Sequence, residues 1–162
     1  MANSSIIGKA KNEIIKALIN DNAVVNAIEP DEIESKEDLI NTYIFNFHQN
    51  PNTINEVKTF ITVQVHIPSQ YTGSKILVNT NVEIWIISHE DHMRVGNIPK
   101  VTENRNDYLS KLIDEKLNGS TIFGLGKLML KSNLEGAYQK NYLYRQLVFT
   151  VADINDSLCD IG

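Results

Sequence analysis

A chain of 162 residues, 42% apolar and 22% charged, has the size and composition of one ordinary globular domain with its own hydrophobic core. Its formal net charge of −5 argues against unaided binding to nucleic acid or an anionic membrane, because either would need a basic patch. The single cysteine, Cys159, excludes an intramolecular disulfide, and no apolar run approaches the roughly 20 residues of a membrane helix. We therefore expect one domain over residues 1–162, without a membrane span, in a reducing compartment.

The N-terminal segment predicts an amphipathic helix over residues 5–20, with Ser4 or Ser5 as its cap. Its apolar residues recur at steps of three and four, which places them on one stripe: Ile7, Ala10, Ile14, Ala17 and Leu18. Asp21 is a candidate N-cap for a second, short helical turn that ends before Pro30. Both segments are expected to pack by one face against a sheet.

Two runs of alternating apolar residues, 57–67 and 76–86, form the centre of the chain. β-branched residues at every second position predict strands with one buried face. The polar segment 68–75 between the two runs contains Pro, Ser, Thr and Gly, so we expect a β-hairpin with an extended tip. Further β-prone runs predict strands over residues 39–47, 126–134 and 142–152.

Residues 103–117 give the clearest helical pattern, with Thr102 as the expected cap. Lys111 is spaced for ion pairs with Asp107 and Glu115 along the exposed side. The expected buried stripe consists of Tyr108, Leu109, Leu112, Ile113 and Leu117.

The order helix, strand, hairpin, helix, two strands predicts an α+β fold. Strands joined by short loops pair antiparallel, so we expect a mainly antiparallel β-sheet with two amphipathic helices packed on one face. Residues 1–5 and 153–162 are expected to form flexible tails.

Two polar segments could carry chemistry. Residues 29–38 hold six acidic residues and one lysine, and such runs usually form solvated loops. His89-Glu90-Asp91-His92 suggests a metal site, but its histidines are three residues apart rather than the four that align two ligands on a helix. No third ligand is identifiable from the sequence. We expect a polar turn and no cofactor, with a small metal-dependent enzyme using His89, Asp91 and His92 as an alternative.

The second face of the expected sheet also carries large side chains. If helices cover only one face, these residues are exposed, and clustered exposed aromatic residues usually mark a contact surface. Alternatively, the sheet curls and buries them, or a helix covers this face instead. The candidate subunit or partner contacts are Phe60, Tyr71, Trp85, Ile87, Tyr142 and Tyr144.

The layout from residue 6 to residue 152 combines a helix closing with Lys16-Ala17-Leu18, a short turn over 21–28, and a strand pair ending Val82-Glu83-Ile84-Trp85-Ile86-Ile87. A helix containing Tyr108-Leu109 and a two-strand finish follow. This layout resembles that of phage tail-terminator (tail-completion or neck) proteins. Around residues 31–38 the chain departs from the shortest members by an acidic insertion.

The resemblance implies a non-enzymatic structural protein of the virion, located in the tail or neck and assembled in the cytoplasm of the bacterial host. Members of the family form a hexameric ring that ends tail-tube polymerisation. They contact the tail-tube protein and the head-completion or connector protein, and DNA only passes through the lumen. The expected particle is a phage tail or a related contractile particle. A monomeric binding module that uses the sheet face is a further alternative.

Overall fold

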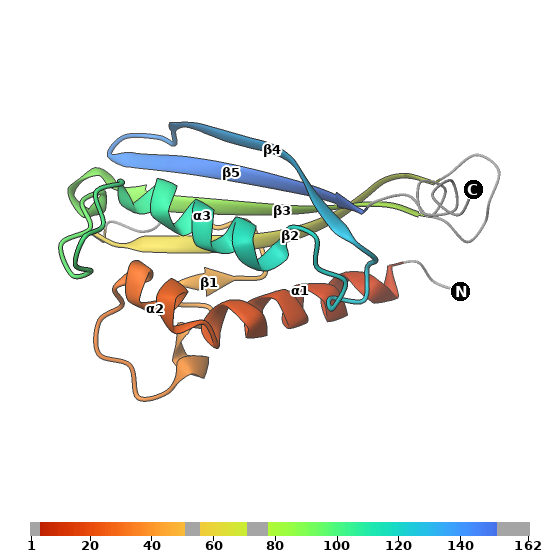
Figure 1. The fold of residues 1–162 in the computed structure, drawn as a ribbon, viewed down its shortest axis with the longest axis horizontal. Coiled ribbons are helices and arrows are strands. Elements are labelled where there is room, and N and C mark those ends of the chain that lie inside the picture. The colour runs from red at the N-terminus through yellow and green to blue at the C-terminus, as the bar shows by residue number, and fades with distance from the viewer. Residues whose placement is uncertain (1–3, 51–55, 71–77, 152–162) are drawn as a thin grey trace.

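The computed structural model describes residues 4–50, 56–70 and 78–151 and shows an α+β fold (Figure 1). Five strands form one sheet in the order β1-β2-β3-β5-β4, and the helices lie together on one face of it. The expected fold class is therefore confirmed. The two amphipathic helices share their face with the short helix that follows Asp21.

The three α-helices are α1 (Ser5–Ile19), α2 (Asn22–Ile28) and α3 (Arg105–Leu117). Single turns of 3₁₀ helix cover Lys36–Leu39 and Glu90–His92. The strands are β1 (Ile44–Phe45), β2 (Thr59–Gln70), β3 (Val78–His89), β4 (Leu128–Ala137) and β5 (Tyr142–Val151). Within the described ranges, no helix has both the length and the apolar character to cross a membrane.

Of the three helices, only α2 has the side-chain cap that the sequence predicts. The Asp21 side chain accepts hydrogen bonds from the first N–H groups of α2, as expected. Ser4 occupies the N-cap position of α1, as expected, but its side chain makes no capping hydrogen bond. The cap of α3 is Asn104 rather than Thr102, because a β-bridge between Asn104 and Arg94 keeps the chain extended up to that residue.

The central hairpin confirms the alternation read from the sequence. β2 and β3 pair antiparallel, with Ile61 opposite Ile86 and Val63 opposite Ile84. All four side chains are buried under the helices. Burying such β-branched side chains stabilises each by about 1.5–3 kcal/mol relative to exposure. The helices close this main core with Ile14, Leu18, Val24, Ile28, Leu109, Ile113 and Leu117.

The first strand differs from the expectation in length and direction. β1 contains only two residues of the expected run 39–47, and it pairs parallel to β2, with Ile44 opposite Ile61. The run is shortened because a 3₁₀ helix occupies its start and Asn41 takes a positive φ of 63°. Parallel pairing requires a long return connection, which residues 46–58 supply.

The expected ion pairs along α3 were also wrong. Asp107 pairs with β5 instead: its Oδ1 accepts from Arg145 Nη2 at 2.6 Å. Lys111 lies 3.7 Å from Glu103 instead. Asp107 therefore faces the sheet, where it ties α3 to β5.

Candidate functional site

The sheet face opposite the helices carries a second, smaller core. Phe45, Phe60, Ile87 and Tyr142 come from four adjacent strands and are all buried. The three aromatic rings meet edge to face, with centroids 6.1 Å apart for Phe45–Phe60 and 6.2 Å apart for Phe60–Tyr142. Partly buried Trp85, Tyr138 and Tyr144 pack against them. We call these seven residues the aromatic half of this face.

The chain itself covers the aromatic half. His48, just after β1, bonds through Nε2 to the Tyr138 hydroxyl at 2.6 Å and lies 5.4 Å from the Trp85 ring. The Tyr142 hydroxyl donates to the Glu56 carbonyl at 2.9 Å. The segment before β2 and the β4–β5 turn therefore cover the aromatic half in place of a helix.

The six candidate contact residues therefore fall into three groups. Phe60, Ile87 and Tyr142 are buried within the chain, so the expectation that they are exposed was wrong. Trp85 and Tyr144 are half-buried at the margin of the cluster. Tyr71 lies outside the described residues. The cover consists of irregular segments of the chain rather than of a curled sheet or a helix, and a role in subunit contact stays a prediction.

Next to the aromatic half, the Glu83 carboxylate is held in place at the middle of the same sheet face. Glu83 Oε1 accepts from Trp85 Nε1 at 2.5 Å and from Gln146 Nε2 at 2.6 Å. Its Oε2 lies 3.1 Å from His66 Nε2. Side chains from three neighbouring strands thus hold one carboxylate in a single orientation.

The remaining part of the face is not covered by any described segment. Glu83 borders a shallow hollow of about 390 Å³. On β4, which lies at the edge of the sheet, Leu134 is 58% exposed and Met129 is 41% exposed. They lie opposite Gln146 and Thr150, respectively, so they share the face of the hollow. We call this region the open half; its residues are His66, Ile67, Asn81, Glu83, Met129, Leu134, Gln146, Val148 and Thr150.

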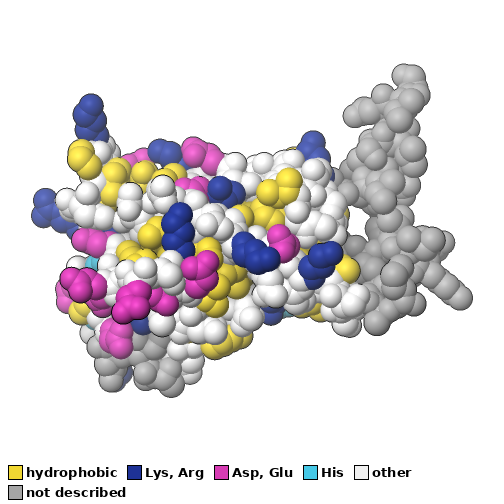
Figure 2. Space-filling view, turned by 90° about the horizontal axis from the view of Figure 1, so that it is seen from below, with side chains coloured by type: hydrophobic (Ala, Val, Ile, Leu, Met, Phe, Trp, Pro, Cys, Tyr) yellow, Lys and Arg dark blue, Asp and Glu magenta, His cyan; other side chains and the backbone are white. Residues whose placement is uncertain are grey.

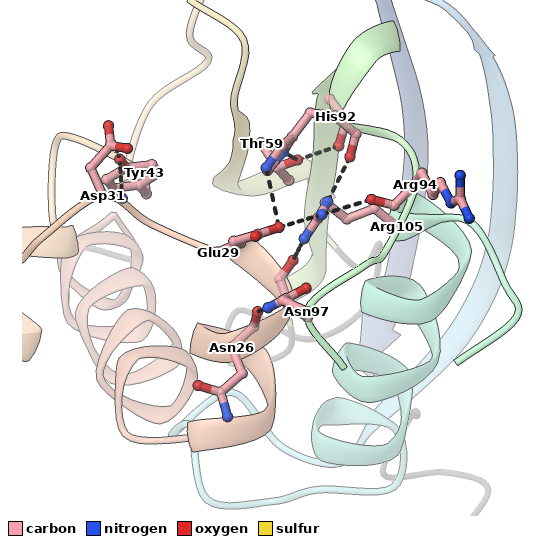
Figure 3. A network of polar contacts seen from close by, with 11 residues as sticks. Asn26, Glu29, Asp31, Tyr43, Thr59, His92, Arg94, Asn97 and Arg105 are labelled. Atoms are coloured by element: carbon pink, nitrogen blue, oxygen red, sulfur yellow. Dashed lines mark hydrogen bonds and ion pairs between the residues drawn. The ribbon is translucent and has the colours of Figure 1, made fainter. Parts of the chain in front are cut away.

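On the helix side, Arg105 forms the centre of a buried polar network (Figure 3). Its side chain is 1% exposed. Nε donates to the His92 carbonyl and Nη1 to the Ala27 carbonyl, both at 2.6 Å. Nη2 donates to the Arg94 carbonyl at 2.9 Å and to Glu29 Oε2 at 2.7 Å. One guanidinium thus joins the C-terminal end of α2, the β3–α3 loop and α3.

The same network fixes the start of the acidic segment. The Tyr43 hydroxyl donates to Asp31 Oδ2 at 3.2 Å and accepts from the Asp31 N–H at 2.9 Å (Figure 3). Burial is the main cause that raises the pKa of Tyr43. Most residues of 29–38 are exposed, as expected for a solvated loop, and acidic side chains gather at one end of the molecule (Figure 2). Glu29 and Asp31 are exposed too, but these contacts hold them in place.

A chain of hydroxyl groups continues inward from His92. His92 Nδ1 lies 2.7 Å from Thr59 Oγ1, which lies 2.7 Å from Ser88 Oγ. The Ser88 hydroxyl donates to Asn106 Oδ1 at 2.6 Å, and Asn106 Nδ2 donates to the Leu143 carbonyl at 3.1 Å. Thr59, Ser88 and Asn106 are buried. This chain was not predictable from the sequence, because polar residues on separate elements carry no common spacing.

Thr59, His92 and Glu29 are the residue types of a hydroxyl–imidazole–carboxylate triad, with His92 Nε2 3.6 Å from Glu29 Oε2. Catalysis requires a nucleophile that a substrate can reach. The Thr59 side chain is fully buried and already bonded to Ser88, and the Glu29 carboxylate is bonded to Arg105. The arrangement therefore stabilises the fold, and Thr59 is not placed to act as a nucleophile.

Electrostatics around His92 favour the neutral ring. Burial, followed by the positive charge of Arg105, lowers the pKa of His92 below its usual value. Glu29 and Asp31 act in the opposite direction without overcoming these effects. The imidazole is therefore built into the network as an uncharged hydrogen-bonding group.

The possible metal ligands of 89–92 have separate surroundings. The His89 ring packs 5.3 Å from the Tyr142 ring, and its Nδ1 accepts from the Asp91 N–H at 3.1 Å. His92 bonds to Thr59 instead. Among the described residues, no group of three or more His, Cys, Asp or Glu side chains is placed to hold a metal ion. The contacts at 89–92 are those of a capped polar turn.

Comparison with known families finds a match that spans residues 12–151 and thus includes all five strands and the second half of α1. The chain belongs to the YomW family. YomW is a family of proteins from Bacillus phage regions, and membership of it is consistent with a phage protein without specifying a tail terminator. No curated protein matches this YomW chain.

Proposed function

We propose that this YomW chain is a structural virion protein that acts as a tail terminator, forming a ring that caps the tail tube and joins it to the head connector. The observation that carries the proposal is the open half: a pleated surface with exposed Leu134 and Met129 that no described segment covers. Large exposed apolar side chains beside a hollow in a sheet face are features of contact surfaces. Membership of a phage-associated family makes a virion subunit the fitting class of partner.

Ring formation requires two different surfaces on every copy, and the rotation from one copy to the next must close the ring. The open half and the helix layer lie on opposite faces of the sheet, so contact between them is heterologous. The Glu83 carboxylate, fixed by its three neighbours, supplies a directional charge within the apolar contact. Such a charge favours one orientation of the partner over others.

The net charge of −5 fits a ring through which DNA slides. Copies of an acidic chain around a lumen repel phosphates, so DNA passes without being retained. A structure of the assembled ring with a basic lumen would remove this part of the proposal.

Deleting the gene from a phage that encodes this chain should produce tails of uncontrolled length that fail to join heads. Electron microscopy of induced lysates measures both effects, and mass spectrometry of purified particles tests whether the wild-type chain is present. Tails of normal length attached to heads would contradict the terminator role. Absence of the chain from particles would contradict any virion role.

Replacing Leu134 by aspartate should prevent complementation of that deletion while leaving the fold intact. Leu134 is 58% exposed, so the change costs the free chain at most about 0.5 kcal/mol. In a subunit contact it would bury an unpaired carboxylate, and each 1.4 kcal/mol lost there weakens association about tenfold. The matched control is Val57→Asp, at a 55% exposed apolar residue before β2 that belongs neither to the open half nor to the helix layer. Equal complementation by both variants would exclude the open half as the contact.

A further inference from the structure

His92 connects two rigid parts of the molecule. Its carbonyl accepts from Arg105 of α3 at 2.6 Å, and its ring bonds to Thr59 of β2 at 2.7 Å. It ends the 3₁₀ turn Glu90–His92, which leads from β3 into the loop before α3. A change in the charge of this ring therefore acts on both parts at once.

Counting protons along the buried hydroxyl chain fixes the tautomer of the ring. The Asn106 amide donates to a backbone carbonyl, so its oxygen takes the only hydroxyl proton of Ser88. The Thr59 hydroxyl must then donate to Ser88, which leaves its oxygen as an acceptor for His92 Nδ1–H. The neutral ring thus carries its proton on Nδ1 and a lone pair on Nε2.

A second proton on His92 would go to Nε2, which lies 3.6 Å from Glu29 Oε2. That oxygen already accepts from Arg105 Nη2 at 2.7 Å (Figure 3). Two cations would then compete for one carboxylate oxygen, and one of them is a buried guanidinium. Of the other charged or titratable groups near the ring, Asp31 favours its protonation, whereas His89 opposes it.

We propose that His92 is a proton-controlled latch: its neutral ring keeps the junction of α2, α3 and the β3–α3 loop closed, and uptake of one proton loosens that junction while the sheet stays folded. The direction of this pH effect follows from the balance of these charges. Because burial and Arg105 lower the pKa of His92 in the closed state, the opened state binds the proton more readily. The latch is fully closed above the usual histidine pKa of about 6.5 and weakens as the pH falls below it.

Hydrogen exchange tests the latch in the full chain at about pH 7.5 and about pH 5.5, on either side of the usual histidine pKa. After correction for intrinsic rates, residues 26–29 and 90–97 should exchange faster at the lower pH, while β3 and β5 should not. His92→Asn, whose amide can donate to Thr59 without titrating, should remove this difference. The control His66→Asn, at the exposed partner of Glu83, should retain it.

Two results would overturn the proposal: an equal pH dependence in His92→Asn and the unmodified chain, or no change at residues 26–29 and 90–97 in the unmodified chain. If His92→Asn fails to fold, NMR titration of the unmodified chain decides instead. A His92 ring protonated on Nδ1, with a titration midpoint below about 6.5 that coincides with the exchange transition, supports the latch. A midpoint at or above that value excludes it.

Discussion

Replacing Arg105 by methionine is expected to lower the free energy of unfolding by about 3–5 kcal/mol, the cost of removing one partner from a buried charged network. Methionine keeps the apolar stem but removes every donor. The carbonyls of Ala27, His92 and Arg94 and the Glu29 carboxylate then lose their hydrogen bonds. Each unsatisfied buried acceptor costs about 1–3 kcal/mol. Chemical denaturation followed by circular dichroism measures the change.

Arg94→Met is the matched control for this substitution. Arg94, two residues after the 3₁₀ turn, contributes only its backbone carbonyl to the network, and its side chain is exposed and points away from it (Figure 3). We expect a change within about 0.5 kcal/mol. Arg105→Lys should lie between the two, because an ammonium cannot reproduce the planar fork of donors. A loss below about 1 kcal/mol in Arg105→Met would show that the network contributes little more than one ordinary hydrogen bond.

The elements with a strong local pattern were predictable. The central hairpin followed from alternation, since Ile61 and Val63 could face the core only together. α2 followed from Asp21 as a cap, and α3 from its apolar stripe. In each case the determining interactions lie within a few residues or within one hairpin.

The polar network could not be read in the same way, because its partners are far apart in the sequence. Arg105 contacts Ala27 across 78 positions, and no spacing rule connects an arginine to a distant carbonyl. One local signal was present. Arg105 opens α3, where the helix dipole disfavours a cation, and this conflict indicates partners outside the helix.

The second sheet face shows a different limit. Strand alternation identified Phe60 and Trp85 as members of that face, but it could not show what covers them. The cover comes from His48 and Glu56, which belong to irregular segments without a periodic pattern. Burial of one half and exposure of the other are therefore properties of loop placement rather than of strand sequence.

Replacing Phe60 by alanine should cost about 3–5 kcal/mol, the range found for fully buried phenylalanines. Phe60 is completely buried at the centre of the aromatic half, between Phe45 and Tyr142. The cavity would also loosen the packing around Trp85, the only tryptophan of the chain. Denaturation should show the loss of stability, and Trp85 fluorescence should shift to longer wavelength in the native state.

The control is Phe47→Ala, because Phe47 is 48% exposed and its ring meets that of Phe45 at the margin of the same cluster, with centroids 5.4 Å apart. Its truncation removes one aromatic contact worth about 0.5–1.5 kcal/mol and leaves little cavity. A similar loss in both variants would mean that the covering segment, rather than the buried cluster, stabilises this face. If instead Phe60→Ala is tolerated and Trp85 keeps its emission, the aromatic half is not a second core.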